Sequence, residues 1–157
     1  MKPLTREEIL LSFSKKERKE IKFPDLESID WDNLDFLGWI HPSGHLGYVV
    51  YELPTRLRGI ILERNSGIAS TGIRMCSWCL TLHFSSGVKL FTYKIPNSNI
   101  TIGDYICADL QCSLYLRGIK KTGISPMQET LSIEEKIERC RRNIEKFFLF
   151  IDEKINK

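Results

Sequence analysis

The sequence contains no continuous apolar run of the roughly 18 residues that a membrane-spanning helix needs. Its N-terminus turns acidic within a few residues and lacks the basic start and apolar stretch of a secretory signal. Nucleotide-binding loops of the Gly-x-Gly-x-x-Gly or Walker type and the Gly-x-Ser-x-Gly elbow of hydrolases are also missing. We therefore expect a cytoplasmic protein with no membrane partner.

Histidine is scarce, with three residues in the chain. His41 and His45 flank a Pro-Ser-Gly segment, which favours an exposed turn over a catalytic dyad. The acids Asp30, Asp32 and Asp35 lack the glycine and closing glutamate of a calcium loop, so a solvated acidic turn is expected there. We predict no catalytic residues, no enzymatic activity and no small-molecule substrate.

The 157 residues correspond in length to one ordinary domain, and 42% of them are hydrophobic, which is enough for a core. The net charge of +3 is unevenly spread. Residues 1–40 carry 7 basic and 9 acidic side chains, residues 41–127 carry 9 and 4, and residues 128–157 carry 7 and 7. The basic middle region can attract an acidic protein surface or RNA. A mildly basic, solvated surface is an equally good interpretation.

The N-terminal region predicts a helical arm followed by an irregular linker. Thr5 and Ser14 each begin a Ser/Thr-x-x-Glu capping box. Between residues 26 and 39, large apolar side chains lie among acids without a regular period. This pattern indicates a linker that is attached to the core through its aromatic side chains, which are Trp31, Phe36 and Trp39.

The middle of the chain is rich in β-branched and aromatic residues, which favours strands. Residues 47–53 and 58–64 flank a short turn and are predicted to pair as a hairpin. A second hairpin is predicted from residues 80–84 and 88–93. Gly87 lies between these two segments and is expected to take a positive φ in the turn.

The C-terminal residues predict one long amphipathic helix. Ser132 begins a third capping box, and apolar residues then recur at steps of three and four. This stripe consists of Ile133, Ile137, Cys140, Ile144, Phe147, Phe148, Ile151 and Ile155. The helix is expected to bury the stripe against the domain, and a partner-binding helix is the alternative. We assign residues 1–40 to the arm and linker and residues 41–157 to the main α+β part of one compact domain.

Four of the five cysteines form two close pairs. A Ser/Gly/Thr-rich loop is expected at residues 65–72, and the C-x2-C pair Cys76 and Cys79 follows it. The C-x4-C pair Cys107 and Cys112 comes after a further 27 residues. Two pairs with a hairpin between them match the tetrahedral four-thiolate ligand set of one zinc ion. Since four thiolates leave no open position for water, the zinc is expected to be structural.

The five-residue step from Cys107 to Cys112 constrains the local structure. Residues five apart on an α-helix differ by about 140° in azimuth, so both cannot face one ion from the same helix. We predict that Cys107 ends a strand, that Asp109 is the N-cap, and that Cys112 is the third residue of the helix. A knuckle, a hairpin and a helix whose first turn supplies a ligand make a treble-clef zinc finger.

Four buried free cysteines and a redox-active C-x-x-C are the alternative interpretations. The redox alternative requires an exposed thiolate at a helix start, whereas strands and turns are predicted around Cys76 and Cys79. His83 is a substitute ligand in principle, but four cysteines already complete the set. Cys140 is expected to lie in the core. The fold class that we predict is α+β, with antiparallel hairpins, a treble-clef zinc finger, an N-terminal helical arm and a long C-terminal helix.

Residues 35–39, 75–80 and 105–113 carry a resemblance to a known family. The sequence there resembles the C-terminal treble-clef zinc-finger domain of the FusB-type elongation factor G-binding proteins, the fusidic-acid resistance family. The resemblance runs from about residue 30 to residue 153. It implies a non-enzymatic protein that binds elongation factor G and promotes its release from the ribosome, with any ribosome contact indirect. The implied zinc ligands are Cys76, Cys79, Cys107 and Cys112.

The residues before the β-rich part number about forty, which is too few for the separate helical bundle of the two-domain resistance proteins. We therefore expect a short, single-domain relative. Several residues near the finger are expected to contact acidic surface on the partner, with the tyrosine as an anchor: Arg74, Tyr115, Arg117, Lys120 and Lys121. An ordinary solvated helix end is the alternative for these cations.

An RNA- or ribosome-binding zinc domain is the alternative function. It draws on the basic middle region and on three aromatic residues that would stack on bases, namely Trp78, Tyr93 and Tyr105.

Overall fold

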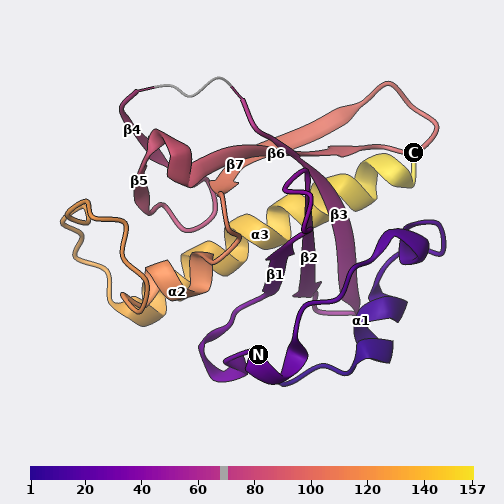
Figure 1. Cartoon of the computed structure of the whole chain (residues 1–157), viewed down its shortest axis with the longest axis horizontal. Coiled ribbons are helices and arrows are strands. Elements are labelled where there is room, and N and C mark those ends of the chain that lie inside the picture. Colours follow the sequence, from indigo (N-terminus) through magenta and orange to yellow (C-terminus); the bar gives the residue numbers. More distant parts are fainter. Residues whose placement is uncertain (68–70) are drawn as a thin grey trace.

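The computed structural model describes residues 1–67 and 71–157, so residues 68–70 of the loop expected at 65–72 lie outside the described residues. A five-stranded antiparallel sheet with the order β1-β2-β3-β6-β7 lies at its centre (Figure 1). The strands are β1 (Leu37–Ile40), β2 (Leu46–Glu52), β3 (Leu57–Asn65), β6 (Val88–Lys94) and β7 (Thr101–Cys107). The hairpin predicted from residues 47–53 and 58–64 is confirmed, because β2 and β3 are antiparallel neighbours.

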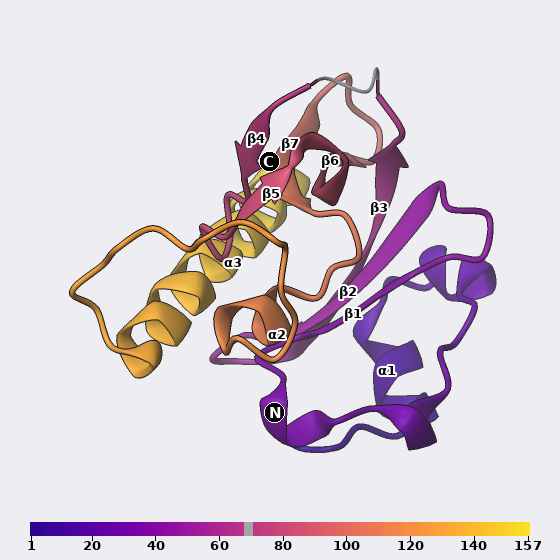
Figure 2. The same cartoon turned by 60° about the vertical axis from the view of Figure 1, so that its left-hand side comes forward.

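Alternation along the strands gives the sheet two buried faces. In β2, Val49 and Tyr51 pack in one apolar cluster, whereas Tyr48 and Val50 pack in another. The first cluster contains residues of α3 (Ile133–Ile155), and the second contains residues of the N-terminal arm. Figure 2 shows α3 and α1 on opposite sides of β1, β2 and β3. The sheet is therefore the middle layer of the protein.

Helix α3 confirms the predicted C-terminal helix. Ser132 Oγ accepts a hydrogen bond from the Glu135 N–H, and the Glu135 side chain accepts one from the Ser132 N–H. The ends of the apolar stripe, Ile133 and Ile155, are 49% and 38% exposed, so the buried stripe is shorter than predicted. Its buried residues are Cys140, Ile144, Phe147, Phe148 and Ile151. Among the helices in the described part of the chain, none combines the length and apolar character that a membrane crossing requires.

The N-terminal arm is made of short helices that pack on the sheet. They are α1 (Arg6–Ser12) and the 3-10 helices η1 (Glu17–Glu20), η2 (Leu26–Ser28) and η3 (Trp31–Asn33). The capping box at Thr5 is confirmed, and Ser14 exchanges hydrogen bonds with Glu17 at the start of η1. Ile9 and Phe13 are buried in the cluster beneath β2. The arm is therefore a layer of the fold.

The linker expected up to residue 39 ends earlier than predicted. Residues 37–40 form the edge strand β1, which places Trp39 opposite Tyr48 of β2. Leu37, Gly38 and Trp39 are all buried, so the strand lacks the apolar–polar alternation that would have revealed it. The proposed boundary at residue 40 thus falls at the end of a strand of the central sheet. The division into an arm and a main part stays a prediction.

The second predicted hairpin is wrong. β5 (Leu82–Phe84) pairs with β4 (Ile73–Met75) across the first cysteine pair and forms a separate two-stranded sheet. The 3-10 helix η4 (Ser85–Gly87) then leads into β6, which pairs with β7 and β3. Gly87 does not have a positive φ. Its role is to leave room for a neighbour, because a Cβ atom at Gly87 would lie 2.6 Å from Nδ1 of His83.

Candidate zinc centre

The two cysteine pairs meet where the β4–β5 hairpin, β7 and α2 (Cys112–Leu116) come together. The four side chains are buried, and their sulfur atoms all lie within 4.8 Å of one another. The Sγ atoms of Cys76 and Cys112 are 3.7 Å apart, and those of Cys79 and Cys107 are 3.5 Å apart. Zinc–sulfur bonds of about 2.3 Å in a tetrahedron give sulfur–sulfur distances of about 3.8 Å. The four sulfurs therefore fit a single zinc ion.

The first pair lies on a tight knuckle. The Leu80 N–H donates to the carbonyl of Cys76 at 2.9 Å, and Leu80 takes a φ of +59° to close the turn. The N–H groups of Trp78 and Cys79 point at Sγ of Cys76, at 3.4 and 3.5 Å. Such donors stabilise the negative charge of a thiolate, so the backbone here is suited to a metal-bound cysteine.

Trp78 fixes this knuckle to the core. Its side chain is fully buried, and its ring packs edge-on against Phe36 at 5.6 Å and Phe147 at 5.5 Å. Its indole N–H donates to the carboxylate of Asp104 at 3.2 Å, and its carbonyl accepts from the Asn143 side chain at 3.0 Å. The first two sulfurs are therefore held by contacts with β7 and α3 as well as by their own turn.

The second pair spans the end of β7 and the start of α2. As predicted, Cys107 is the last residue of its strand and the first turn of the helix supplies Cys112. The prediction that Asp109 is the N-cap is wrong, because Gln111 occupies that position and Cys112 is the first helical residue. The chain first passes through Leu110 at a φ of +57°, which delays the helix. The buried Leu110 side chain packs in the core beneath this turn.

His83 is a close neighbour of the sulfur cluster that the sequence did not assign. Its Nε2 lies 3.2 Å from Sγ of Cys107, and its ring packs edge-on against Tyr115 at 4.7 Å. Burial lowers the pKa of His83, so the ring is neutral near pH 7. A neutral ring with its proton on Nε2 donates to the Cys107 sulfur. His83 therefore serves the centre as a hydrogen-bond donor, outside the group of four sulfurs.

The electrostatics of the site favour a cation. Burial raises the pKa of the Cys112 thiol, and contact with the neighbouring thiols raises it further. Four thiolates in mutual contact need a positive charge among them, which a divalent zinc ion supplies. The fifth cysteine, Cys140, is 1% exposed in the core cluster with α3, which confirms its predicted place.

The residues predicted to contact a partner do not form one surface. Tyr115 and Lys120 are joined through Asp109, whose carboxylate accepts from the Tyr115 hydroxyl at 2.8 Å and from the Lys120 ammonium at 2.5 Å. Tyr115, Lys120 and Lys121 line one pocket of about 520 Å³. Arg74 lies elsewhere, over the ring of Tyr105.

The Arg117 side chain makes an ion pair inside the protein. Its two terminal nitrogens donate to the carboxylate of Asp35 at 2.6 and 2.9 Å, and its side chain is 16% exposed. Asp35 is fully buried and also accepts from Arg141. Arg117 therefore joins α2 to the segment before β1.

The aromatic residues of the RNA alternative are mostly inaccessible. Trp78 is 0% exposed and Tyr93 is 7% exposed, because both fill the core between the sheet and α3. Tyr105 is 46% exposed. The prediction that Trp78 and Tyr93 stack on bases is therefore wrong.

A knuckle, a β-hairpin and a short helix that carries the fourth sulfur define a treble-clef zinc-binding protein. The chain belongs to the family described as the FBP C-terminal treble-clef zinc-finger, whose model matches residues 8–151. The family resemblance carried by the cysteine motifs is thereby confirmed, and so are the α+β fold and the single zinc site.

A solved structure described as that of the fusidic acid resistance protein FusC has a similar fold. The two superpose with a TM-score of 0.58 at 23% sequence identity, over 72% of this chain and 52% of FusC. This chain therefore spans about half the length of FusC. No curated protein sequence matches the chain.

Proposed function

We propose that this protein is a non-enzymatic cytoplasmic adaptor that binds translation elongation factor G and promotes its release from the ribosome. The observation that carries the proposal is the family match, which extends over residues 8–151 and includes both cysteine pairs. The fold shared with the fusidic acid resistance protein FusC supports the same role. Because the chain spans about half of FusC, the proposal concerns binding and release of elongation factor G and does not extend to resistance to fusidic acid.

The zinc centre supports a structural role within this function. We assign Cys76, Cys79, Cys107 and Cys112 as the four ligands on the basis of their burial and mutual distances. Four thiolates close the coordination shell against water and substrate. The ion would then hold the β4–β5 hairpin against β7 and α2, and the surface around these elements would be the part that meets the partner.

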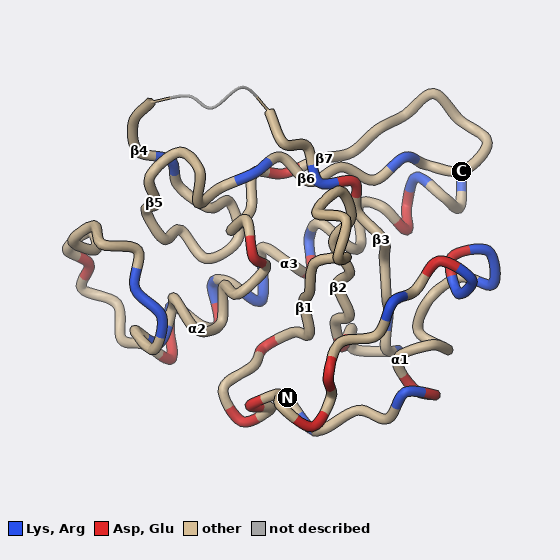
Figure 3. The backbone as a smooth tube through the Cα atoms, viewed as in Figure 1, with Lys and Arg blue, Asp and Glu red and all other residues tan. Residues whose placement is uncertain are grey.

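The basic stretch that follows α2 is our candidate contact on this surface. Figure 3 shows basic residues in the loop after α2, while acidic residues gather along the N-terminal arm. Lys121 has no carboxylate partner among the described residues, whereas Lys120 is paired with Asp109 and also lies 5.4 Å over the Tyr115 ring. Arg74 supplies a second basic point beside the exposed ring of Tyr105. These groups suit an acidic face on a protein partner.

A calorimetric titration of the zinc-loaded protein against purified elongation factor G, at two salt concentrations, tests the proposal. We expect saturable binding that weakens only modestly with salt, as for a mixed apolar and charged protein interface. A double variant, Lys120→Glu with Lys121→Glu, should bind more weakly. Its matched control reverses Lys15 and Lys16, which are exposed on the remote N-terminal arm. Absence of binding by the folded, zinc-loaded protein would refute the proposal.

RNA binding is the second candidate function. The basic middle region and the exposed Tyr105 ring, with the Arg74 guanidinium 5.3 Å from its centre, favour it. RNA affinity should fall steeply as salt rises, because counterions are released on binding. A titration with ribosomal RNA fragments under the same two salt conditions therefore separates the two functions.

A further inference from the structure

The outer face of the β4–β5 hairpin is an exposed apolar strip. Ile73 pairs with Phe84 across the two strands, and Met75 pairs with Leu82. Alternate residues of a strand share a face, so these four side chains lie together. Ile73 is 57% exposed, Phe84 58% and Met75 38%. A contiguous apolar strip of this kind marks an interaction surface on a soluble domain.

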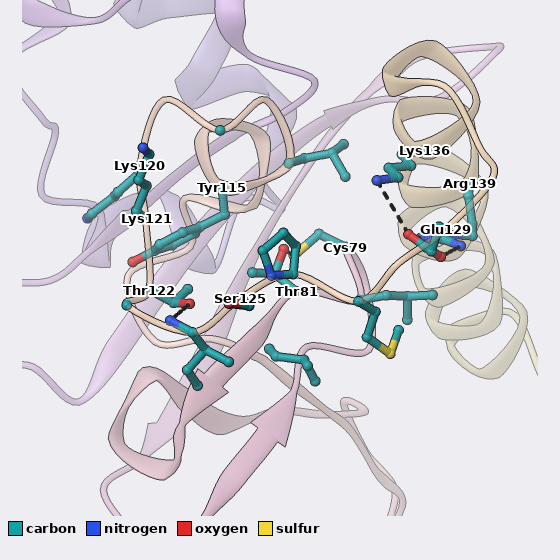
Figure 4. A pocket seen from close by; sticks show the side chains of 18 residues that line it. Cys79, Thr81, Tyr115, Lys120, Lys121, Thr122, Ser125, Glu129, Lys136 and Arg139 are labelled. Atoms are coloured by element: carbon teal, nitrogen blue, oxygen red, sulfur yellow. Dashed lines mark hydrogen bonds and ion pairs between the residues drawn. The ribbon is translucent and has the colours of Figure 1, made fainter.

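The strip leads into a pocket of about 520 Å³ between the knuckle, the loop after α2 and the start of α3 (Figure 4). Leu82 belongs to both the strip and the pocket, since it pairs with Met75 in the strip and also lines the pocket. Gly123, also in the pocket wall, lies beside the Phe84 ring, because a Cβ atom there would be in ordinary contact with the ring at 3.8 Å. The remaining apolar lining comes from Leu80, Leu116, Ile124, Pro126 and Met127.

The rim of the pocket is basic at both ends. Figure 4 shows Lys120 and Lys121 at one end and Lys136 and Arg139 at the other. Glu129 is the carboxylate of the lining, and it accepts from Arg139 at 2.6 Å and pairs with Lys136 at 3.6 Å. The pocket lining therefore carries four cations and one carboxylate, and Asp109, outside the lining, is paired with Lys120.

We propose that the pocket and the strip together bind an acidic segment of the partner protein. One large apolar side chain of this segment would enter the pocket, its carboxylates would lie against the basic rim, and its flanking apolar residues would cover Ile73 and Phe84. The inference rests on the proposed function, and it names the surface that receives elongation factor G. A buried apolar anchor surrounded by polar contacts is the arrangement that concentrates binding energy in protein interfaces.

The chemistry of the surface favours an acidic protein segment over RNA. Three of the four side chains of the strip, Ile73, Met75 and Leu82, are aliphatic and offer no plane for a base, which leaves the Phe84 ring as the single stacking surface on the strip. Three of the four rim cations are already paired, Lys136 and Arg139 with Glu129 and Lys120 with Asp109, so the rim suits a few carboxylates better than a run of phosphates. A carboxylate-bearing segment with an apolar anchor matches both parts of the surface.

The zinc centre is built into the wall of this pocket. Cys79, Leu80 and Thr81 all line it, and the Cys79 sulfur lies 3.2 Å from the Thr81 hydroxyl. The knuckle that carries two of the metal ligands therefore also forms part of the surface that the partner would contact. Binding by this surface should require the zinc-loaded protein.

Calorimetry with purified elongation factor G and a matched pair of variants tests the inference. The strip variant combines Ile73→Thr with Phe84→Ser, and the control is Leu11→Ser, which alters a 57% exposed side chain on α1 on the other side of the sheet. All substituted residues are exposed, so both variants should fold and hold one zinc ion. We expect the strip variant to bind about tenfold or more weakly. The control should bind as the wild type does.

Methyl NMR locates the contact directly. Isotope-labelled protein should show shifts for Ile73, Leu82 and Met127 on addition of elongation factor G, with Leu11 unchanged. If elongation factor G binds wild type and strip variant equally, or shifts other methyl groups, the inference is wrong and the proposed function stands. If the folded, zinc-loaded wild type does not bind elongation factor G, the function and the inference both fail. Shifts of these methyl groups by RNA fragments alone would also overturn the acidic-segment proposal.

Discussion

The carboxylate of Asp35 and the guanidinium of Arg117 form a two-pronged ion pair across 82 positions of the chain. Asp35 precedes β1, and Arg117 follows α2, whose first residue belongs to the zinc centre. Arg141 of α3 adds a third contact at 3.3 Å. The side chain of Ser113 in α2 accepts from the Asp35 N–H, so one residue links the N-terminal segment to both helices.

Replacing Asp35 should therefore destabilise the whole protein. Asp35→Ala leaves the mostly buried Arg117 charge without its partner, and breaking such a pair costs about 3 kcal/mol or more. The measurement is urea unfolding of the zinc-loaded protein. Asp32→Ala is the control, because Asp32 is an exposed acid on η3. Equal unfolding free energies for the two variants would show that the ion pair contributes little.

The close contact between Gly87 and His83 predicts that their substitutions have coupled effects on stability. Gly87→Ala forces the His83 ring away from Cys107, and overpacking of this kind costs about 1–3 kcal/mol. In a His83→Ala background the same substitution should cost less, because the ring atoms Nδ1 and Cγ are absent and only the close contact with the Cβ atom of residue 83 remains. A double-mutant cycle by denaturant unfolding measures this coupling. Additive effects would mean that the two residues act independently.

His83→Ala alone should weaken zinc binding. The substitution removes the donor to the Cys107 sulfur without touching a ligand, and loss of such a partner costs roughly 10–100-fold in metal affinity. Competition with a chromogenic chelator measures the affinity. Substitution of His45, which lies in the exposed turn before β2, is the control and should leave the affinity unchanged.

Removal of a zinc ligand should unfold the finger. Structural zinc contributes roughly 10–16 kcal/mol of apparent free energy in isolated fingers, which is comparable with the stability of a whole domain. We expect Cys112→Ser to lose its zinc, and its circular-dichroism melt should lack the cooperative transition of the wild type. Cys140→Ser tests specificity, because it should retain one zinc ion. A Cys112→Ser melt that matches wild type would contradict the ligand assignment.

Asp104 gives a pH-dependent prediction. Burial raises the pKa of its carboxyl group above the unfolded value, so the folded protein favours the protonated form. The contribution of Asp104 to the free energy of unfolding therefore falls as pH rises from the unfolded pKa of the carboxyl group to its folded pKa. It is least favourable at neutral pH. Asp104→Asn removes the buried charge while its side-chain oxygen still accepts from Trp78. The variant should be more stable than wild type at pH 7.5 in thermal melts with zinc present, and the difference should shrink as the pH is lowered toward 3.8, the ordinary pKa of an aspartate.

Local patterns in the sequence predicted the local parts of the structure. The capping boxes at Thr5 and Ser132 were predictable because both partners lie within four residues. The spacing within each cysteine pair predicted that its two sulfurs lie close together, because each pair is closed by its own tight turn. The N-cap was predicted at Asp109, two residues before the observed Gln111, because the left-handed turn at Leu110 leaves no mark in the residue types around it.

Long-range partners could not be predicted. β5 has three residues, and the sequence predicted that this segment pairs with residues 88–93, which follow it. Its observed partner is β4, because the knuckle between the two strands brings them together. Arg117 was expected at the surface because its partner, Asp35, lies in a different part of the chain. His83 was considered only as a substitute ligand, since its contact with Cys107 spans 24 positions.

The place of Trp78 limits how far the protein can be divided. This residue lies inside the first cysteine pair, yet its ring packs between Phe36 before β1 and Phe147 of α3. A fragment limited to residues 73–118 would keep all four cysteines and expose this indole to water. We expect such a fragment to aggregate, so grafting or miniaturising the finger would have to include the segment before β1 and α3.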